Sequence, residues 1–186
     1  MGRTTILTIS FLPPQAKERP TEGVVVAAGP GRLHPHTGVR IQNPVKPGDS
    51  VLYGKFDGSP IEYNDDQCQV IRDDDIMVSY QGLTMTLENC QPIRDYVLIQ
   101  LEEPALETLS GIVVAAQVTK EDVPCEGRVL KVGEGRMASD GKLTKVPFKV
   151  GDYVKFKDYG GNDVVIEGKP FSLVRMVDIL ATLNEE

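Results

Sequence analysis

The chain has 186 residues, a formal net charge of −7 and a sequence pI of about 4.9. An acidic chain without a local stripe of lysine and arginine repels a phosphate backbone, so we expect no nucleic-acid partner. No apolar run approaches the roughly 20 residues that cross a bilayer, and residues 1–15 lack the pattern of a signal peptide, so we expect no membrane partner.

The composition predicts an all-β fold. Hydrophobic residues make up 40% of the chain and aromatic residues only 6%, so a core must consist mostly of valine, isoleucine and leucine. Eighteen glycines and thirteen prolines interrupt the sequence too often for long helices. The three cysteines, Cys68, Cys90 and Cys125, are far apart, which fits a reducing compartment rather than a disulfide framework or a metal knuckle.

The first half of the chain contains short predicted strands separated by turns. Residues 1–21 begin with alternating apolar residues and continue with prolines at 13, 14 and 20, which predict an extended loop. A β-branched strand over 24–28 follows, and we expect Thr37-Gly38 or its neighbours to close a hairpin. The acidic residues 73–75 are predicted to form a solvated turn, and the junction between the halves is placed in 82–89.

The second half repeats this order. Residues 93–101 predict a strand, and Asp140-Gly141 is a strong hairpin signal. The segments 22–32 and 126–136 are both β-branched runs that end in a Gly-X-Gly turn, and they lie 126 − 22 = 104 residues apart. A repeat of domain size predicts two tandem domains.

The two predicted domains differ at their beginnings. We place them at 1–82 and 91–186, with a linker at 83–90. The second domain opens with a strand over 92–101, but nothing before Thr5 corresponds to it. Either the first domain lacks this strand, or residues 6–12, whose apolar residues alternate, are recruited to form it.

The order and spacing of the motifs resemble the GroES-type co-chaperonins, and their doubling resembles the tandem, double-domain co-chaperonins of plastids. The motifs of the second half are GIVV at 111–114, EGRVLKVGEGR at 126–136, KVGDYVKFKDYGG at 149–161 and LVRMVDILATL at 173–183. Those of the first half are FLPPQAKERPTEGVVVAAGPGR at 11–32, KPGDSVLYGKFDG at 46–58 and VIRDDDIM at 70–77. Together they cover most of the chain.

The resemblance implies two small GroES-like β-barrels, each with a roof hairpin and a mobile loop. In this family a hydrophobic tripeptide of the loop docks on a large ring chaperonin and closes its chamber over a non-native substrate protein. The tripeptide falls on these residues of the second and first halves: Ile112, Val113 and Val114, and Ser10, Phe11 and Leu12. Ser10 is a poorer match, because an aliphatic residue is expected there. Without the resemblance, residues 112–114 would be interpreted as a core strand.

The resemblance also points to residues of the roof and of the cavity. Four of them fall on the roof hairpins: His34, His36, Asp140 and Gly141. We expect both histidines at an exposed tip, and two histidines without a third ligand predict no metal site. Tyr159, with Phe56 at the matching position, is either an aromatic residue that lines the cavity or a packing residue at the barrel edge.

We therefore predict a non-enzymatic co-chaperonin that needs no cofactor, because ATP is bound by the partner chaperonin. The implied assembly is a ring of identical chains, alone or mixed with a single-domain co-chaperonin. The resemblance implies the plastid stroma, with the cytoplasm and the mitochondrial matrix as alternatives. Two rival functions are the barrel of a zinc-dependent alcohol dehydrogenase, whose clustered Cys/His ligands are absent from the sequence, and a β-barrel adaptor unrelated to chaperonins.

Overall fold

A computed structural model gives the fold and describes residues 6–9, 21–63, 66–101, 125–138, 140 and 142–183. In these residues every regular element is a β-strand, except for one 3₁₀ turn, η2, at Met176–Asp178. The all-β prediction is confirmed.

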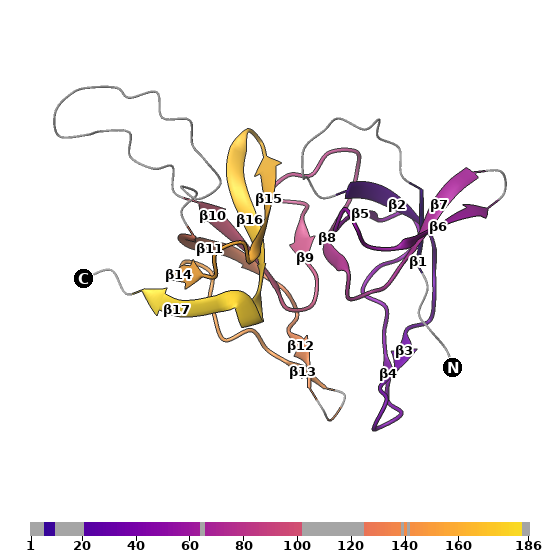
Figure 1. The fold of residues 1–186 in the computed structure, drawn as a ribbon, viewed down its shortest axis with the longest axis horizontal. Coiled ribbons are helices and arrows are strands. Elements are labelled where there is room, and N and C mark those ends of the chain that lie inside the picture. Colours follow the sequence, from indigo (N-terminus) through magenta and orange to yellow (C-terminus); the bar gives the residue numbers. More distant parts are fainter. Residues whose placement is uncertain are drawn as a thin grey trace.

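Most of the strands belong to two antiparallel sheets that lie side by side (Figure 1). The first sheet has the spatial order β6 (Ser59–Tyr63), β7 (Asp66–Ile71), β1 (Ile6–Ile9), β2 (Thr21–Ala28), β5 (Ser50–Tyr53), β8 (Ile76–Tyr80) and β9 (Gln91–Pro92). The second has the order β15 (Gly161–Ile166), β16 (Lys169–Arg175), β10 (Tyr96–Leu101), β11 (Glu126–Val132), β14 (Tyr153–Phe156) and β17 (Ile179–Leu183). The repeat in the sequence is thus a repeat in topology.

Two short hairpins project from the same side of the molecule (Figure 1). One pairs β3 (Arg32–Leu33) with β4 (Arg40–Ile41), and the other pairs β12 (Arg136–Met137) with β13 (Leu143–Thr144). We call them the roof hairpins. The predicted turn at Thr37-Gly38 lies between β3 and β4, which confirms that hairpin.

The first sheet contains the N-terminal strand that the sequence left uncertain. Strand β1 pairs with β2 and β7 in the way that β10 pairs with β11 and β16, and both strands carry an irregularity at the same place in the β1–β2 and β10–β11 pairings. Ile6 occupies the position of Val97, at an offset of 97 − 6 = 91 residues. This offset is smaller than the 104 residues that separate the segments 22–32 and 126–136, because the connection that follows β1 is shorter than the one that follows β10.

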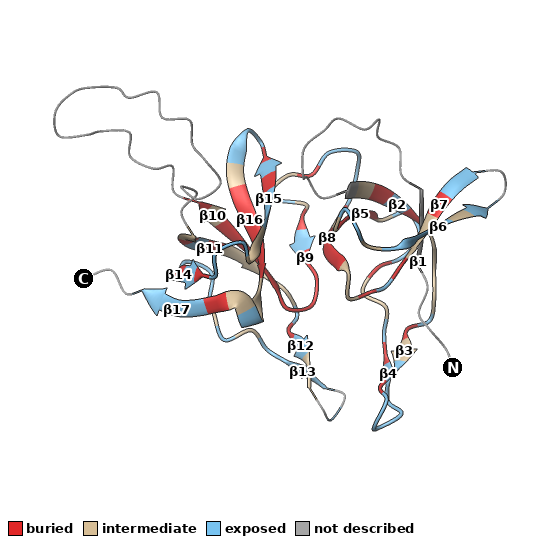
Figure 2. Ribbon diagram, viewed as in Figure 1, coloured by how far each residue is buried: buried red, intermediate tan, exposed pale blue. Residues whose placement is uncertain are grey.

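Each sheet covers a buried apolar cluster (Figure 2). The cluster of the first sheet contains Val25, Val45, Val51, Tyr53, Ile71, Ile76 and Ile93. That of the second contains Val97, Ile99, Leu101, Val129, Val154, Phe156, Val174 and Ile179. Cys68 and Phe171, which occupy equivalent positions at an offset of 171 − 68 = 103 residues, are both buried.

A third cluster joins the two halves, and we call it the joint core. It contains residues of the first half, of the segment between the halves and of the second half: Leu52, Met77, Val78, Tyr80, Met85, Cys90, Tyr96, Leu98, Val164, Ile166, Phe171 and Leu173. Strand β9, which lies after the predicted linker, pairs with β8 of the first sheet, and Ile93 packs in the first cluster. The two halves therefore share both a sheet and a core.

The glycines of the repeated Gly-X-Gly turn are required at the base of the roof hairpins. Gly135 has φ +122°, and a Cβ there would lie 2.1 Å from the carbonyl oxygen of Thr144. Gly151 also has a positive φ, +100°, but an added Cβ there meets nothing within 4 Å.

We expect Gly135→Ala to lower the free energy of unfolding by more than Gly151→Ala. The left-handed conformation alone costs about 1–3 kcal/mol, and only Gly135→Ala adds a clash with backbone that cannot give way. Paired denaturation curves measure the difference. Equal losses would show that the close approach to Thr144 does not matter.

Candidate functional site

The predicted docking residues lie outside the described part of the chain. This holds for Ile112, Val113 and Val114, for Ser10, Phe11 and Leu12, and for Gly141 of the roof. What the structure describes is where the two connecting segments are anchored. One joins the end of β1 to the start of β2, and the other joins β10 to β11.

The two connecting segments differ in length. Residues 10–20 number 20 − 9 = 11, and residues 102–125 number 125 − 101 = 24. A fully extended chain spans at most about 3.6 Å per residue, so a segment that leaves the barrel and returns reaches at most about 20 Å in the first case and about 40 Å in the second. The second segment can therefore project twice as far.

Tyr159 and Phe56 occupy equivalent, highly exposed positions. Tyr159 is 77% exposed and Phe56 is 91% exposed. Tyr159 also has a positive φ of 62°, an uncommon conformation for a residue other than glycine. Neither ring is buried within the single chain, and the Nζ of Lys55 lies 5.6 Å from the centroid of the Phe56 ring.

The two histidines of the first roof hairpin differ in exposure. His36 is exposed, but the expected exposure of His34 is wrong, because only 7% of it is accessible. The backbone N–H of Thr37 donates to Nδ1 of His34, and the two imidazole rings meet edge to face at 5.9 Å. These contacts fold His34 into the turn. Asp140, on the second hairpin, is exposed.

Arg94 connects the two halves next to the joint core. It is buried and has a left-handed backbone (φ 55°), and its carbonyl accepts a hydrogen bond from the N–H of Gly135. One Nη donates to the carbonyl oxygen of Gln42 at 2.7 Å and lies 3.4 Å from Asp73, and the other lies 3.5 Å from Glu134. The repeated turn thus fixes an arginine that reaches into the first half.

The acidic turn 73–75 receives these contacts and is not the solvated turn that the sequence suggested. Asp73 is buried between Arg32 and Arg94. Asp74 binds Arg32 through both carboxylate oxygens, and its carbonyl oxygen accepts a hydrogen bond from Arg175 of the second half at 2.9 Å. The turn is a polar contact between the halves.

Burial raises the pKa of the Asp73 carboxyl above its ordinary value of 3.8, and the charge of Asp74 adds to the rise, while Arg32 and Arg94 oppose it. Folding therefore favours the protonated acid. The stabilisation of the fold by protonated Asp73 is fully present below pH 3.8, and it is lost as the pH rises through the raised pKa.

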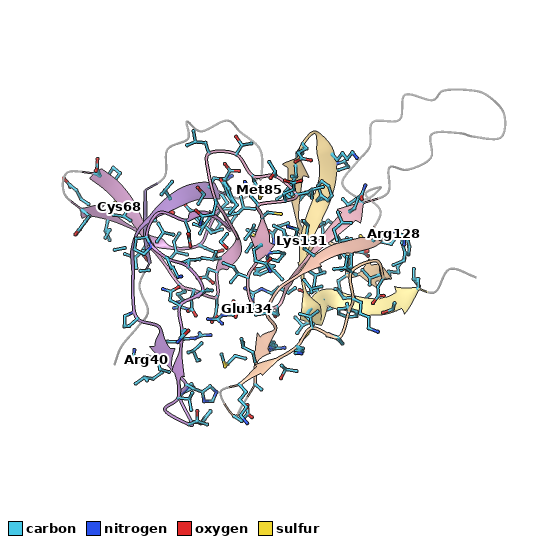
Figure 3. The ribbon with its side chains drawn as sticks, turned by 180° about the vertical axis from the view of Figure 1, so that it is seen from behind. Arg40, Cys68, Met85, Arg128, Lys131 and Glu134 are labelled. Atoms are coloured by element: carbon cyan, nitrogen blue, oxygen red, sulfur yellow. The ribbon has the colours of Figure 1, made fainter. Side chains whose placement is uncertain are left out.

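A cavity of about 340 Å³ lies between the two roof hairpins. Arg40 and Pro44 of the first half and Glu134, Met137 and Leu143 of the second contribute to its walls. In Figure 3, Arg40 lies on the first half and Glu134 on the second, and Lys131 and Met85 lie higher in the view, near the contact between the halves. Lys131 fixes the segment between the halves, because its ammonium donates to the carbonyl oxygen of Cys90 at 2.7 Å.

The described residues contain no cluster of three or more histidine, cysteine or acidic side chains that could hold a metal. Burial raises the pKa of the Cys90 thiol, so it stays protonated at neutral pH and is a poor nucleophile. Among the same residues, no helix has the length and apolar character to span a membrane.

Comparison with known proteins gives a family match for both halves. The model of the chaperonin 10 kDa subunit matches residues 5–80 and again 89–183. Over 94 residues the chain is 38% identical to the co-chaperonin GroES of Desulfosudis oleivorans, an alignment that covers 50% of this chain and 97% of that protein.

Longer relatives align with almost the whole chain. The chain is 32% identical over 175 residues to the chloroplastic 20 kDa chaperonin of Arabidopsis thaliana, which covers 94% of this chain and 67% of that protein. The protein of the same name from Spinacia oleracea is 29% identical over 175 residues, with 94% and 66% covered. The chain thus spans about two thirds of the length of these two relatives.

Proposed function

This chain belongs to the chaperonin 10 family, whose named relatives are co-chaperonins and not enzymes, and we propose that it caps a large ring chaperonin and encloses a non-native protein for folding. The observation that carries the proposal is the family match over both halves, together with the repeated topology of the two sheets. The fold is accordingly two tandem GroES-like β-barrels.

The segment that joins β10 to β11 is the one we propose to dock on the chaperonin, through Ile112, Val113 and Val114. Its greater length supports this choice, because it can project about twice as far as the segment that carries Ser10, Phe11 and Leu12. The first tripeptide also begins with a polar residue. We propose that the first segment contributes little to docking.

Each docking contact should be weak by itself. Burial of the three apolar side chains gains about 1.5–3 kcal/mol for each, but ordering of the segment costs about 1–2 kcal/mol per residue. Several segments on one ring make the later contacts intramolecular, which raises the overall affinity by ~10²–10⁴-fold. A lid held in this way can bind tightly and still be released.

Co-sedimentation with a large ring chaperonin, with and without ATP, tests the proposal. We expect the chain to sediment with the chaperonin only when the chaperonin has bound nucleotide. The chain itself is expected to need no cofactor, since the partner binds ATP. An adaptor unrelated to chaperonins would not sediment under either condition.

Several chains must associate if the chain forms a lid. We propose that the contact between two chains resembles the contact between the two halves of one chain, and we call each such contact a joint. Strand β8 is covered by β9, whereas β17, its counterpart, ends its sheet within the described part of the chain. On β17, Leu180 is 60% exposed and Leu183 is 38% exposed. We propose that this strand and its neighbour β14, which we call the β17 face, bind the first domain of a second copy.

The complementary surface lies on the first domain. Ile61 and Tyr63 occupy the positions of Val164 and Ile166, at an offset of 164 − 61 = 103 residues. Ile166 is 1% exposed in the joint core, but Tyr63 is 44% exposed. A head-to-tail contact of this kind closes into a ring when its rotation permits.

We expect Leu180→Asp with Leu183→Asp to dissociate the ring into single chains. Loss of two buried leucines removes about 1.5–3 kcal/mol each from every joint between chains, so association weakens by at least ~100-fold. Analytical ultracentrifugation measures the change, with Val150→Asp, an exposed position in a turn, as the control. Intact rings in the double variant would reject the β17 face as the interface.

We further propose that Tyr159 and Phe56, exposed at equivalent positions, face the enclosed substrate protein. Rings mixed with a single-domain co-chaperonin are compatible with the same head-to-tail contact. The chloroplastic names of two relatives favour the plastid stroma over the cytoplasm or the mitochondrial matrix.

A further inference from the structure

The surface formed by β5 and β8 in the first half and the equivalent surface formed by β14 and β17 in the second half are not equally apolar. In the joint within a chain, β5 and β8 contribute Leu52, Met77, Val78 and Tyr80, all buried. The equivalent residues of β14 and β17, at an offset of 155 − 52 = 103, are Lys155, Leu180, Ala181 and Leu183. All four of these are exposed in the single chain.

The largest difference is between Leu52 and Lys155. Leu52 is 2% exposed in the joint core, while the Lys155 side chain is 54% exposed. A contact on the β17 face that copied the joint core would have to desolvate an ammonium group where the joint core buries an apolar side chain. At two of the other three positions the β17 face carries a smaller side chain than the joint core. Ala181 stands at the position of Val78, and Leu183 stands at the position of Tyr80.

Lys155 has little structural role of its own in the folded domain. Its ammonium lies 3.8 Å from the carboxylate of Glu126, and both side chains are well exposed. Ion pairs of this kind contribute little to stability. Lys155 can therefore be replaced without loss of the fold, and its effect on assembly can be measured separately.

We propose that the ring contains two unequal joints in alternation, a permanent one within each chain and a weaker, reversible one between chains, and that Lys155 is the residue that keeps the second one weak. The inference rests on the ring proposed above. Chains would then enter and leave the ring at the β17 face, and the two domains of one chain would stay together. Asp73, which corresponds to Met176 at the same offset, adds a second chemical difference between the two joints.

Lys155→Leu copies the residue of the permanent joint into the reversible one. We expect the dissociation constant between chains to fall by about 10–100-fold, the effect of burying one leucine. Exchange of chains between isotope-labelled and unlabelled rings, followed by native mass spectrometry, should slow to a similar extent. Lys142→Leu, at an exposed position near the tip of the second roof hairpin, controls for added hydrophobicity.

The outcomes separate the two proposals. If wild-type rings form and Lys155→Leu exchanges as fast as wild type or as Lys142→Leu, the role of Lys155 is rejected and the ring stands. If wild type and Lys155→Leu both remain single chains at every concentration, the ring itself is rejected, and the unequal joints with it.

The reciprocal variant, Leu52→Lys, tests the permanent joint. We expect the amide of Ile93, which donates to the carbonyl oxygen of Met77 across the joint, to exchange its hydrogen at least ~10-fold faster than in wild type. Unchanged exchange would contradict the claim that Leu52 makes this joint the stronger one.

Discussion

Replacement of Ile112 and Val114 by aspartate is expected to abolish binding to the chaperonin while both sheets stay folded. Each lost apolar side chain removes about 1.5–3 kcal/mol of burial, or together ~10³-fold in affinity per docking segment. Because several segments bind at once, the losses multiply over the ring. ATP-dependent co-sedimentation measures binding, and circular dichroism checks that the β-structure is retained.

The matched control is Phe11→Asp with Leu12→Asp in the shorter segment. We expect this pair to weaken binding only slightly, because residues 10–20 reach at most about 20 Å from the barrel. Unchanged binding of the first pair of variants would reject the docking role of residues 112–114. Equal losses in both pairs would mean that both segments of each chain engage the chaperonin.

Phe171→Ala is expected to destabilise the whole chain rather than its second half. Phe171 is fully buried in the joint core, and truncation of a buried phenylalanine to alanine costs about 3–5 kcal/mol. For a chain of this size the loss lowers the melting temperature by roughly 6–20 °C. Because residues of both halves pack in the same cluster, we expect one calorimetric transition that shifts as a unit.

Val165→Ala provides the control, because Val165 is exposed on the neighbouring strand β15. A surface substitution of this kind changes the free energy of unfolding by at most about 0.5 kcal/mol. Two separate transitions, of which only one moves in Phe171→Ala, would contradict a shared core.

The tandem architecture was predictable because the repeat is regular. Constant offsets in the sequence aligned the second half with the first from the Gly-X-Gly turn onward, and the roof hairpin at Thr37-Gly38 followed from turn chemistry. Strand β1 was harder to assign. It has only four residues, Ile6–Ile9, and the shorter connection after it changes the offset to 91, so the repeat does not continue through it.

The joint between the halves could not be predicted from local patterns. Asp73 has the local appearance of a solvated turn, and its burial follows from long-range contacts with Arg32 and Arg94. Arg94 lies beyond the predicted linker, in a left-handed conformation that the sequence does not reveal. The sequence contained one signal of the joint. Asp73 and Asp74 correspond to Met176 and Val177 in the second half, so the repeat is broken at a place where the two surfaces have different partners. The docking assignment of residues 112–114 remains a prediction.

The joint core also changes the thermodynamics of assembling a lid. A ring built from single domains loses the translational and rotational freedom of a separate body at every joint, about 4–15 kcal/mol each time. In the ring proposed above, half of the joints would form as the polypeptide folds, whatever its concentration, because the segment from 81 to 90 is held by Met85, Cys90 and Lys131. A complete ring of such chains therefore needs half as many encounters, and it should persist at dilutions where a ring of separate domains of equal contact strength would fall apart.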